Sequence, residues 1–263
     1  SRQSKGMNIA NLLPIAADEK VTSMIRVPEF DEEKYLVMVT KQGIIKRISL
    51  NAYNTARKGG LIALELNEGD ELAWVRLTDG DQQVIVATKN GLAIRFEETD
   101  VRPMGRQARG VKAISLREGD CVVGMCVVAN DDLILTASET GFGRISNVSD
   151  YRLQSRGGKG ITNYHTEKYG NVAAVSAVKP DEDIIIISQE GVIIRIAADT
   201  VRICNRPSKG VTLMRIGEND KVVTVARAPH EDSESEKTEE TAEEETSEEN
   251  TAPETNAEEN TEE

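Results

Sequence analysis

The 263-residue sequence is poor in aromatic residues, histidine and cysteine, and it contains no long apolar run. Aromatic residues make up 3% of the chain, too few for the stacking platforms that hold single strands or for an aromatic docking patch. The two histidines and three cysteines match no spacing of metal ligands, and no nucleophile or phosphate-loop motif occurs. We therefore expect a soluble, cytoplasmic protein that has no membrane contact, no metal site and no catalytic centre in this chain.

The formal charge of −13 is unevenly distributed along the chain. The segment 230–263 contains 16 acidic residues, one lysine, and no Leu, Ile, Val or aromatic residue. Because such a segment has no apolar side chains to bury, we predict that it forms a disordered acidic tail. Residues 1–229 then form the folded domain, and with 31 basic and 29 acidic residues this domain is slightly positive.

The body of the chain repeats with a period of about fifty residues. A basic stretch that ends on glycine recurs as SRQSKG, TARKGG, RQARG, QSRGGKG and NRPSKG, ending at Gly6, Gly60, Gly110, Gly160 and Gly210. The last four of these glycines are 50 residues apart. A second series of glycines, each at a predicted turn, comprises Gly43, Gly91, Gly141 and Gly191, with spacings of 48, 50 and 50 residues. A repeat of this length is typical of propellers and related arrays.

Each repeat is predicted to contain four β-strands. Segments such as CVVGMCVV and GVIIRI are short and rich in β-branched residues, and Asn90-Gly91 between VIVAT and LAIRF favours a hairpin turn. A hairpin would pair the second and third strands, the basic glycine loop would follow, and segments such as GVKAISL would form the fourth strand. The sequence predicts an all-β, propeller-like fold of about four complete blades. The end of another blade, residues 1 to about 17, precedes them, which indicates a C-terminal fragment of a longer protein.

Several features together resemble the carboxy-terminal domain of DNA gyrase A subunits, over essentially all of residues 1–229. They are the basic glycine loops, the hairpins with an arginine after the turn glycine, the EGD starts of successive units and the acidic tail. The hallmark of that family, the gyrase A box, reads Q-R-R-G-G-K-G, and the segment QSRGGKG matches it except at Ser155. In the family the full box lies in the first blade, whereas the best match here lies in a late repeat. The resemblance implies a six-bladed β-pinwheel in the complete protein, with one outer rim that binds and bends duplex DNA.

The resemblance also implies a parent enzyme. This would be an ATP-dependent type II topoisomerase that introduces negative supercoils, with its cleavage tyrosine in an amino-terminal part not present here. ATP and Mg²⁺ would be used by the B subunit, so this fragment itself needs no cofactor. The implied partners are duplex DNA and, within an A2B2 complex at the nucleoid, a second A subunit together with the B subunit.

Two alternatives remain open. One is the A subunit of topoisomerase IV, a relative with fewer and more degenerate repeats. The other belongs to a different class, a protein-binding β-propeller scaffold that has no affinity for DNA.

Positive charge repeated once per unit is suited to binding a duplex along its phosphates, and neighbouring glycines allow backbone N–H groups to approach. The primary candidates for phosphate contacts are Arg57, Lys58, Arg106, Arg109, Gln154, Arg156, Gly157, Gly158, Lys159, Gly160, Arg206 and Lys209. The secondary candidates are Arg2, Lys5, Arg47, Arg95, Arg102, Arg144, Arg152, Arg195 and Arg202. The hairpin arginines rank lower because Arg144 follows its turn glycine by three residues and the others by four, and one step along a strand reverses the face. No recognition helix is apparent, so binding should not depend on DNA sequence.

Overall fold

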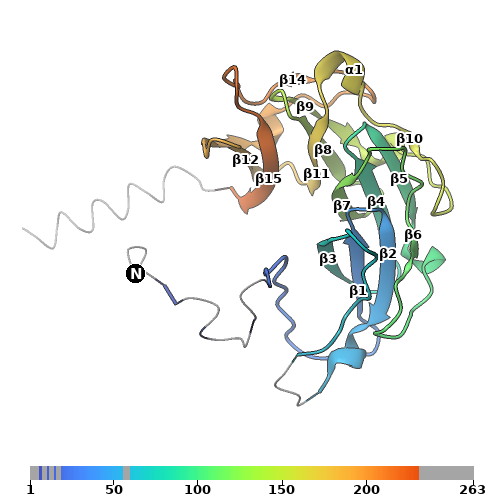
Figure 1. Ribbon diagram of the computed structural model, residues 1–263. Coiled ribbons are helices and arrows are strands. Elements are labelled where there is room, and N and C mark those ends of the chain that lie inside the picture. Colours follow the sequence, from blue (N-terminus) through green and yellow to red (C-terminus); the bar gives the residue numbers. More distant parts are fainter. Residues whose placement is uncertain (1–5, 8–10, 12–14, 16–18, 56–59, 231–263) are drawn as a thin grey trace, which may run out of the picture. The chain divides into compact units, whose positions relative to one another are not determined.

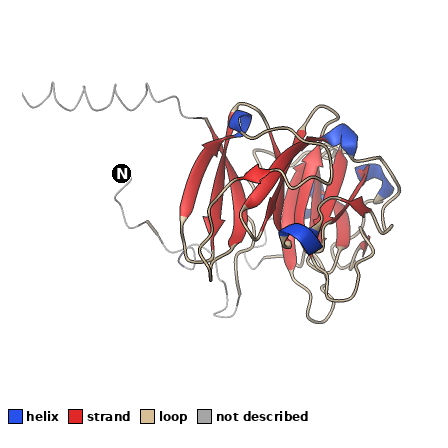
Figure 2. Ribbon diagram, turned by 90° about the horizontal axis from the view of Figure 1, so that it is seen from above, coloured by secondary structure: helices blue, strands red, loops and turns tan. Residues whose placement is uncertain are grey.

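The structure, a computed structural model, describes residues 19–55 and 60–230 together with the isolated positions 6, 7, 11 and 15. The chain up to Ala228 is one compact unit, and its described part contains four β-sheets (Figures 1 and 2). Of the predicted acidic tail, residues 230–263, all but His230 lies outside the described residues. Among the described residues, no helix has the length and apolar character needed to cross a membrane.

Each sheet is built around one antiparallel hairpin. The hairpins are β1 (Tyr35–Thr40) with β2 (Ile44–Ser49), β4 (Gln83–Thr88) with β5 (Leu92–Glu97), β8 (Leu133–Ser138) with β9 (Phe142–Asn147), and β12 (Glu182–Ser188) with β13 (Ile193–Ala197). The four turn glycines have φ between 78° and 85°, a region that strains any residue with a side chain. In the second hairpin the Gly91 N–H donates to the Thr88 carbonyl at 3.0 Å and closes the turn. The hairpins predicted from the glycine series are therefore confirmed.

A longer strand flanks each hairpin on one edge. These strands are β3 (Leu72–Thr78) beside β1, β7 (Val122–Val128) beside β4, β11 (Val172–Val178) beside β8, and β15 (Val222–Pro229) beside β12. Each follows its hairpin in the chain after a long excursion through the basic loop. Short turns, η2 (Leu50–Tyr53), η3 (Glu98–Asp100), η4 (Val148–Asp150) and η5 (Ala198–Thr200), end the hairpins, and α1 (Thr166–Tyr169) precedes β11.

A two-residue strand completes the opposite edge of three sheets. These strands are β6 (Val111–Lys112) beside β2, β10 (Ile161–Thr162) beside β5, and β14 (Val211–Thr212) beside β9. Each comes from the following repeat, so the chain crosses to the preceding sheet, pairs briefly and returns. We call the edge formed by β6, β10 and β14 the loop edge; in Figure 1, β6 and β10 lie on the side of the sheets away from β3 and β7.

The predicted fourth strand is thus real but shorter than expected, and it belongs to the preceding blade. After β6, the Ala113 N–H still donates to the Gly43 carbonyl at 2.8 Å, but the Ser115 N–H donates to the Gly158 carbonyl of the next loop at 2.8 Å. The chain therefore leaves the sheet after two paired residues to contact its neighbour. The fourth described sheet, in the order β13-β12-β15, has three strands.

Apolar side chains fill the space between successive sheets. Within β4, Val84 and Val86 pack towards the first sheet, while Ile85 and Ala87 belong to the cluster shared with the third sheet. Alternate residues of a strand point to opposite faces, so a strand covered on both faces must be apolar throughout. This explains the uninterrupted apolar run in VIVAT.

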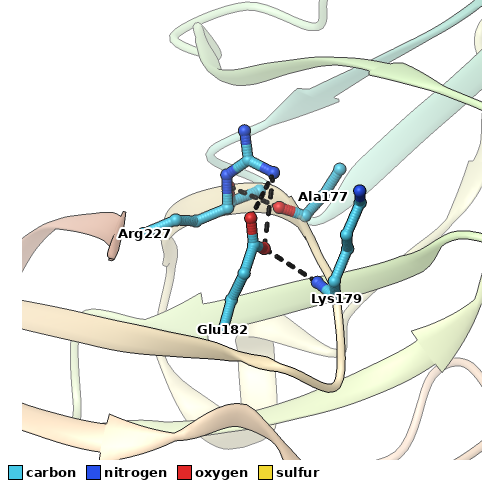
Figure 3. A network of polar contacts seen from close by, with 5 residues as sticks. Ala177, Lys179, Glu182 and Arg227 are labelled. Atoms are coloured by element: carbon cyan, nitrogen blue, oxygen red, sulfur yellow. Dashed lines mark hydrogen bonds and ion pairs between the residues drawn. The ribbon is translucent and has the colours of Figure 1, made fainter. Parts of the chain in front are cut away.

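Polar contacts on the side of the long strands join strands within a sheet and turns of neighbouring sheets. Figure 3 shows one of them in the fourth sheet, where the Glu182 carboxylate accepts from the Arg227 guanidinium on β15 at 3.5 Å. The same carboxylate accepts from the backbone N–H of Lys179 at 2.9 Å. A second contact, the ion pair from Lys89 Nζ to Glu139 at 3.4 Å, joins the turns of the second and third hairpins.

Candidate nucleic-acid interface

Three basic loops occupy equivalent places along the loop edge. They comprise residues 101–110, 151–160 and 201–210, and each runs from the short turn of one sheet to the two-residue strand that pairs with the preceding sheet. Because the pairing of each two-residue strand with the preceding sheet, which we call strand exchange, occurs for all three loops, their equivalent residues stand in equivalent surroundings. The loops alternate with the sheets as the 50-residue period predicts.

Backbone contacts fix the course of each loop. An N–H near its start donates to a carbonyl of the preceding hairpin: Met104 to Arg47 (2.9 Å), Gln154 to Arg95 (3.0 Å) and Cys204 to Ile145 (2.8 Å). At its end, the final glycine lies against the same hairpin. A Cβ on Gly110, Gly160 or Gly210 would approach a backbone carbonyl oxygen to 2.6, 2.5 or 1.9 Å. The closing glycines are therefore required by the strand exchange itself.

The loop cations fall into three equivalent sets with matching exposure. The arginines at the head of each loop, Arg102, Arg152 and Arg202, are exposed. The residues before the closing glycine, Arg109, Lys159 and Lys209, are exposed as well. The middle set, Arg106, Arg156 and Arg206, is half-buried. Each described loop thus presents two exposed positive charges and one partly covered charge at the loop edge.

Two of the half-buried arginines, Arg156 and Arg206, are held by carbonyl groups of the preceding unit. Arg156 donates from Nε to the Asp100 carbonyl at 3.0 Å and from Nη1 to the Lys112 carbonyl at 3.2 Å. Arg206 makes the same two contacts, 50 residues on, with Asp150 at 2.8 Å and Thr162 at 2.5 Å. These contacts use two of the five guanidinium N–H donors and orient the group without neutralising its charge.

Aromatic rings support the cations of the last loop. The Arg206 guanidinium carbon lies 5.1 Å from the centroid of the Tyr151 ring, and Lys209 Nζ lies 3.6 Å from that of Phe142. The Tyr164 hydroxyl donates to the Lys209 carbonyl at 3.1 Å. Cation–π contacts of this kind restrict the side chains and leave their charge intact. Sequence reasoning missed this support because the low aromatic content concealed a local cluster.

The first described loop differs in one contact. The Arg109 guanidinium pairs with the Glu65 carboxylate at 2.6 Å, and both side chains are exposed. The hydrogen bond and the charge of Arg109 lower the pKa of Glu65. A phosphate that binds Arg109 must compete with this carboxylate, although an exposed pair of this kind is weak.

The residues that match the gyrase A box make structural contacts as well as surface charge. The Gly157 N–H donates to the Ala113 carbonyl at 2.6 Å, and the Ser115 hydroxyl donates to the Gly157 carbonyl at 2.7 Å. The N–H of Gly157 is therefore not available to a phosphate, contrary to our expectation. Gln154 is also half-buried, with its side-chain nitrogen inside the protein. Within this segment Lys159 is the exposed cation.

Two hairpin arginines are buried and donate hydrogen bonds to the neighbouring sheet. Arg47 is 6% exposed, donates to the Glu98 carbonyl at 3.1 Å and stacks on the Tyr35 ring at 4.1 Å. Arg95 is equally buried and donates to the carbonyls of Val148 and Tyr151 at 3.0 and 3.1 Å. Each guanidinium thereby caps the turn of the next sheet, and we no longer assign these arginines to an interface.

The expected reversal of face in the third hairpin is confirmed by the register. Arg144 pairs opposite Thr136, as Lys46 pairs opposite Met38, whereas Ile145 takes the register of the buried arginines. Arg144 is fully buried and donates to the Asn163 carbonyl at 2.6 Å, so it too leaves the set of interface candidates. Burial lowers its pKa.

Lys46 is a structural residue that sequence reasoning missed. It is fully buried, and its Nζ donates to the carbonyls of Ala63 and Arg106 at 2.6 and 2.5 Å. Burial lowers the pKa of this amine. Lys46 follows its turn glycine by three residues, as Arg144 does, and this shared position in the sequence could have indicated that the two side chains point to the same face. Lys46 anchors the loop that carries Arg106.

The remaining candidates are not part of the three basic loops. Arg195, on β13, forms an ion pair with Asp183 at 2.6 Å, so a carboxylate already pairs with its charge. Four basic candidates, Arg2, Lys5, Arg57 and Lys58, lie outside the described residues. In the part of the chain that the structure describes, no group of three or more His, Cys, Asp or Glu side chains is arranged to hold a metal ion.

Comparisons with known proteins agree with this repeat architecture. The family model described as "DNA gyrase C-terminal domain, beta-propeller" matches residues 34–79, 82–128, 132–179 and 182–229. The DNA gyrase A subunit of Clostridium acetobutylicum is 54% identical over 111 residues, which cover 42% of this chain and 13% of that protein. The match thus spans a small part of the curated relative.

Two solved structures share the fold. The C-terminal domain of a DNA topoisomerase IV matches with a TM-score of 0.80 and 27% identity, covering 91% of this chain and 75% of that one. A DNA gyrase A C-terminal domain matches with a TM-score of 0.75 and 28% identity, covering 86% of this chain and 76% of that one.

Proposed function

The chain belongs to the family of DNA gyrase C-terminal β-propeller domains, and on that premise we propose that it binds duplex DNA along the loop edge and bends it. The observation that carries this proposal is the repeated set of cations in equivalent, rigidly held loops. Exposed charges recur at Arg102, Arg152 and Arg202 and again at Arg109, Lys159 and Lys209. A duplex carries about one negative charge per 1.7 Å of axis, so it fits a path of charges better than a small ligand does.

The contacts would be made to the DNA backbone and not to base edges. The described residues contain one four-residue α-helix, too short to serve as a recognition helix in the major groove. The half-buried arginines Arg156 and Arg206 are already oriented by carbonyl groups, so less conformational entropy is lost when they meet a phosphate. Bending 20–30 base pairs through 40–90° costs roughly 1–6 kcal/mol, and phosphate contacts from several loops offset that cost.

At the level of the whole protein, we propose that the parent is the A subunit of a DNA gyrase. In that role the domain wraps a duplex segment so that an ATP-dependent type II topoisomerase introduces negative supercoils. The proposed partners are a second A subunit together with a B subunit, working on the bacterial nucleoid, with ATP and Mg²⁺ used by the B subunit. The 54% identity to a gyrase A subunit supports this parent.

A second candidate parent is the A subunit of topoisomerase IV. The TM-score of 0.80 to a domain of that enzyme favours it on grounds of fold. The two parents differ in the supercoiling that they would produce, and both require that this domain bind duplex DNA.

A salt titration of binding tests the proposal. Fluorescence anisotropy of the full chain with a labelled duplex of about 40 base pairs should show affinity that falls linearly with the logarithm of salt concentration. The slope should be about 0.9 for each phosphate neutralised. Absence of binding at low salt, or binding that ignores salt, would refute the proposal and leave the protein-binding scaffold as the better interpretation.

A further inference from the structure

An exposed apolar side chain follows the leading arginine of each basic loop. Leu153 follows Arg152 and is 49% exposed, and Ile203 follows Arg202 and is 51% exposed. In the first described loop the same place is taken by Pro103, which is also exposed. Single exposed apolar residues are common on proteins, but recurrence at one position of three repeats needs a reason. Leu153, whose loop is followed by another described loop, is as exposed as Ile203, so the open edge at β13 does not account for the exposure.

These side chains are mounted on a rigid frame. Leu153 forms a parallel β-bridge with Arg95, and Ile203 forms the equivalent bridge with Ile145. The next residue of each loop donates its N–H to that same hairpin residue. The apolar side chains are therefore presented at fixed, repeated points and not on mobile loop tips.

Exposed cations of the same loop accompany each apolar side chain. Ile203 lines a shallow depression together with Arg202, Arg206 and Lys209. The 50-residue repeat places Leu153 among the equivalent residues of its own loop. An occupant of this surface has to combine closely spaced negative charge with apolar surface between the charges. Duplex DNA has this combination, because phosphates flank stacked bases.

We propose that Leu153 and Ile203 act as wedges that enter the minor groove and insert between base pairs of the bound duplex, kinking it at successive loops. The inference rests on the proposed function and adds to it the means of bending. The flanking cations would hold the phosphates on both sides of the opened step, while the apolar side chain replaces part of the lost stacking. Pyrimidine–purine steps unstack most easily, so the kinks should prefer TA and CA/TG steps without any base-specific hydrogen bond.

The test uses the full chain and duplexes that carry 2-aminopurine at a TA step, with a donor and acceptor dye at the ends. The wild-type chain should raise the 2-aminopurine fluorescence and bring the dyes together. The double variant Leu153→Ala/Ile203→Ala should lose the fluorescence rise and much of the bend. Its affinity should fall by about fivefold for each side chain, the effect of losing roughly half of a buried Leu or Ile. Its salt slope should stay that of the wild type, since no phosphate contact is removed.

Two further variants make the result specific. Val223→Ala removes a 43% exposed side chain on β15, at the opposite side of its sheet, and should change nothing. Leu153→Met/Ile203→Met keeps an apolar side chain at each point and should restore the signals.

If the wild type binds with a steep salt slope but gives no 2-aminopurine signal, the wedge is refuted while the proposed function stands. The same holds if the alanine variant bends DNA as the wild type does. If the wild type shows no salt-dependent binding, the proposed function fails and the wedge fails with it.

Discussion

Replacing the exposed cation before each closing glycine should weaken DNA binding in proportion to the charge removed. The triple variant Arg109→Gln/Lys159→Gln/Lys209→Gln keeps the length of the side chains and the turn glycines. If each cation neutralises one phosphate, the slope of log affinity against log salt should become shallower by about 2.7, since each contact contributes about 0.9. The loss in affinity should be largest at low salt and shrink as salt screens the remaining charges.

The structure also ranks two of the single variants. Arg109 is paired with Glu65 at 2.6 Å, so part of its attraction for phosphate is already satisfied by a carboxylate. Lys209 is held against the Phe142 ring at 3.6 Å, so it loses less side-chain freedom on binding. Lys209→Gln should therefore cost more affinity than Arg109→Gln.

The assay is fluorescence anisotropy of a labelled duplex, titrated at five or more salt concentrations. Lys179→Gln is the matched control, because this exposed lysine follows β11, on the opposite side of its sheet from the loop edge. A triple variant with the wild-type slope, or a control that loses as much as the triple variant, would refute the placement of DNA on the loop edge.

Four other outcomes are expected from the structure and from the charge of the chain. Arg95→Ala should lower the free energy of unfolding by about 3 kcal/mol in urea, because it leaves buried carbonyl groups without a donor, while the salt slope of DNA binding stays unchanged. Gly210→Ala should lower the free energy of unfolding by more than about 2 kcal/mol, because its Cβ would lie 1.9 Å from a carbonyl oxygen and its φ is 80°. Gly105→Ala, which has open space around its Cβ position, should be neutral in the same urea unfolding experiment. Burial raises the pKa of the Cys126 thiol to about 11, so the folded state favours the protonated thiol. The resulting contribution to the free energy of unfolding is complete below pH 9 and is lost as pH rises towards 11. Cys126→Ala should therefore remove about 2–3 kcal/mol of the decline in unfolding free energy at alkaline pH. Deleting residues 231–263, with their net negative charge, should tighten DNA binding at low salt and have little effect at high salt, and equal affinities at low salt would exclude competition by the tail.

The glycine series made the hairpins and the loops predictable. A turn that needs positive φ leaves its mark in the sequence as glycine, and the 50-residue step then places equivalent residues in equivalent positions. The exposure of Lys159 and Lys209 follows from the same argument. These features depend on local backbone geometry, which a single sequence records.

Strand exchange was not predictable, because it depends on the choice of a partner far along the chain. The pairing of β6 with β2 joins residues more than 60 positions apart, and GVKAISL alone carries no mark of that partner. The same limit explains the hairpin arginines. Nothing near Arg47 in the sequence indicates the Glu98 carbonyl that it reaches in the next sheet. A charge on a strand was interpreted as an exposed charge, whereas the carbonyl groups of a neighbouring turn made its burial possible.

The central claim, that the loop edge guides a duplex along a curved path, is tested most directly by the linking number of DNA. Nicked circular DNA is ligated with and without the full chain, the protein is removed, and the topoisomers are separated on a gel. We predict a shift of the distribution in one direction that grows with protein concentration and disappears for Arg109→Gln/Lys159→Gln/Lys209→Gln. An unchanged distribution under conditions where the wild type is bound would contradict wrapping by this chain.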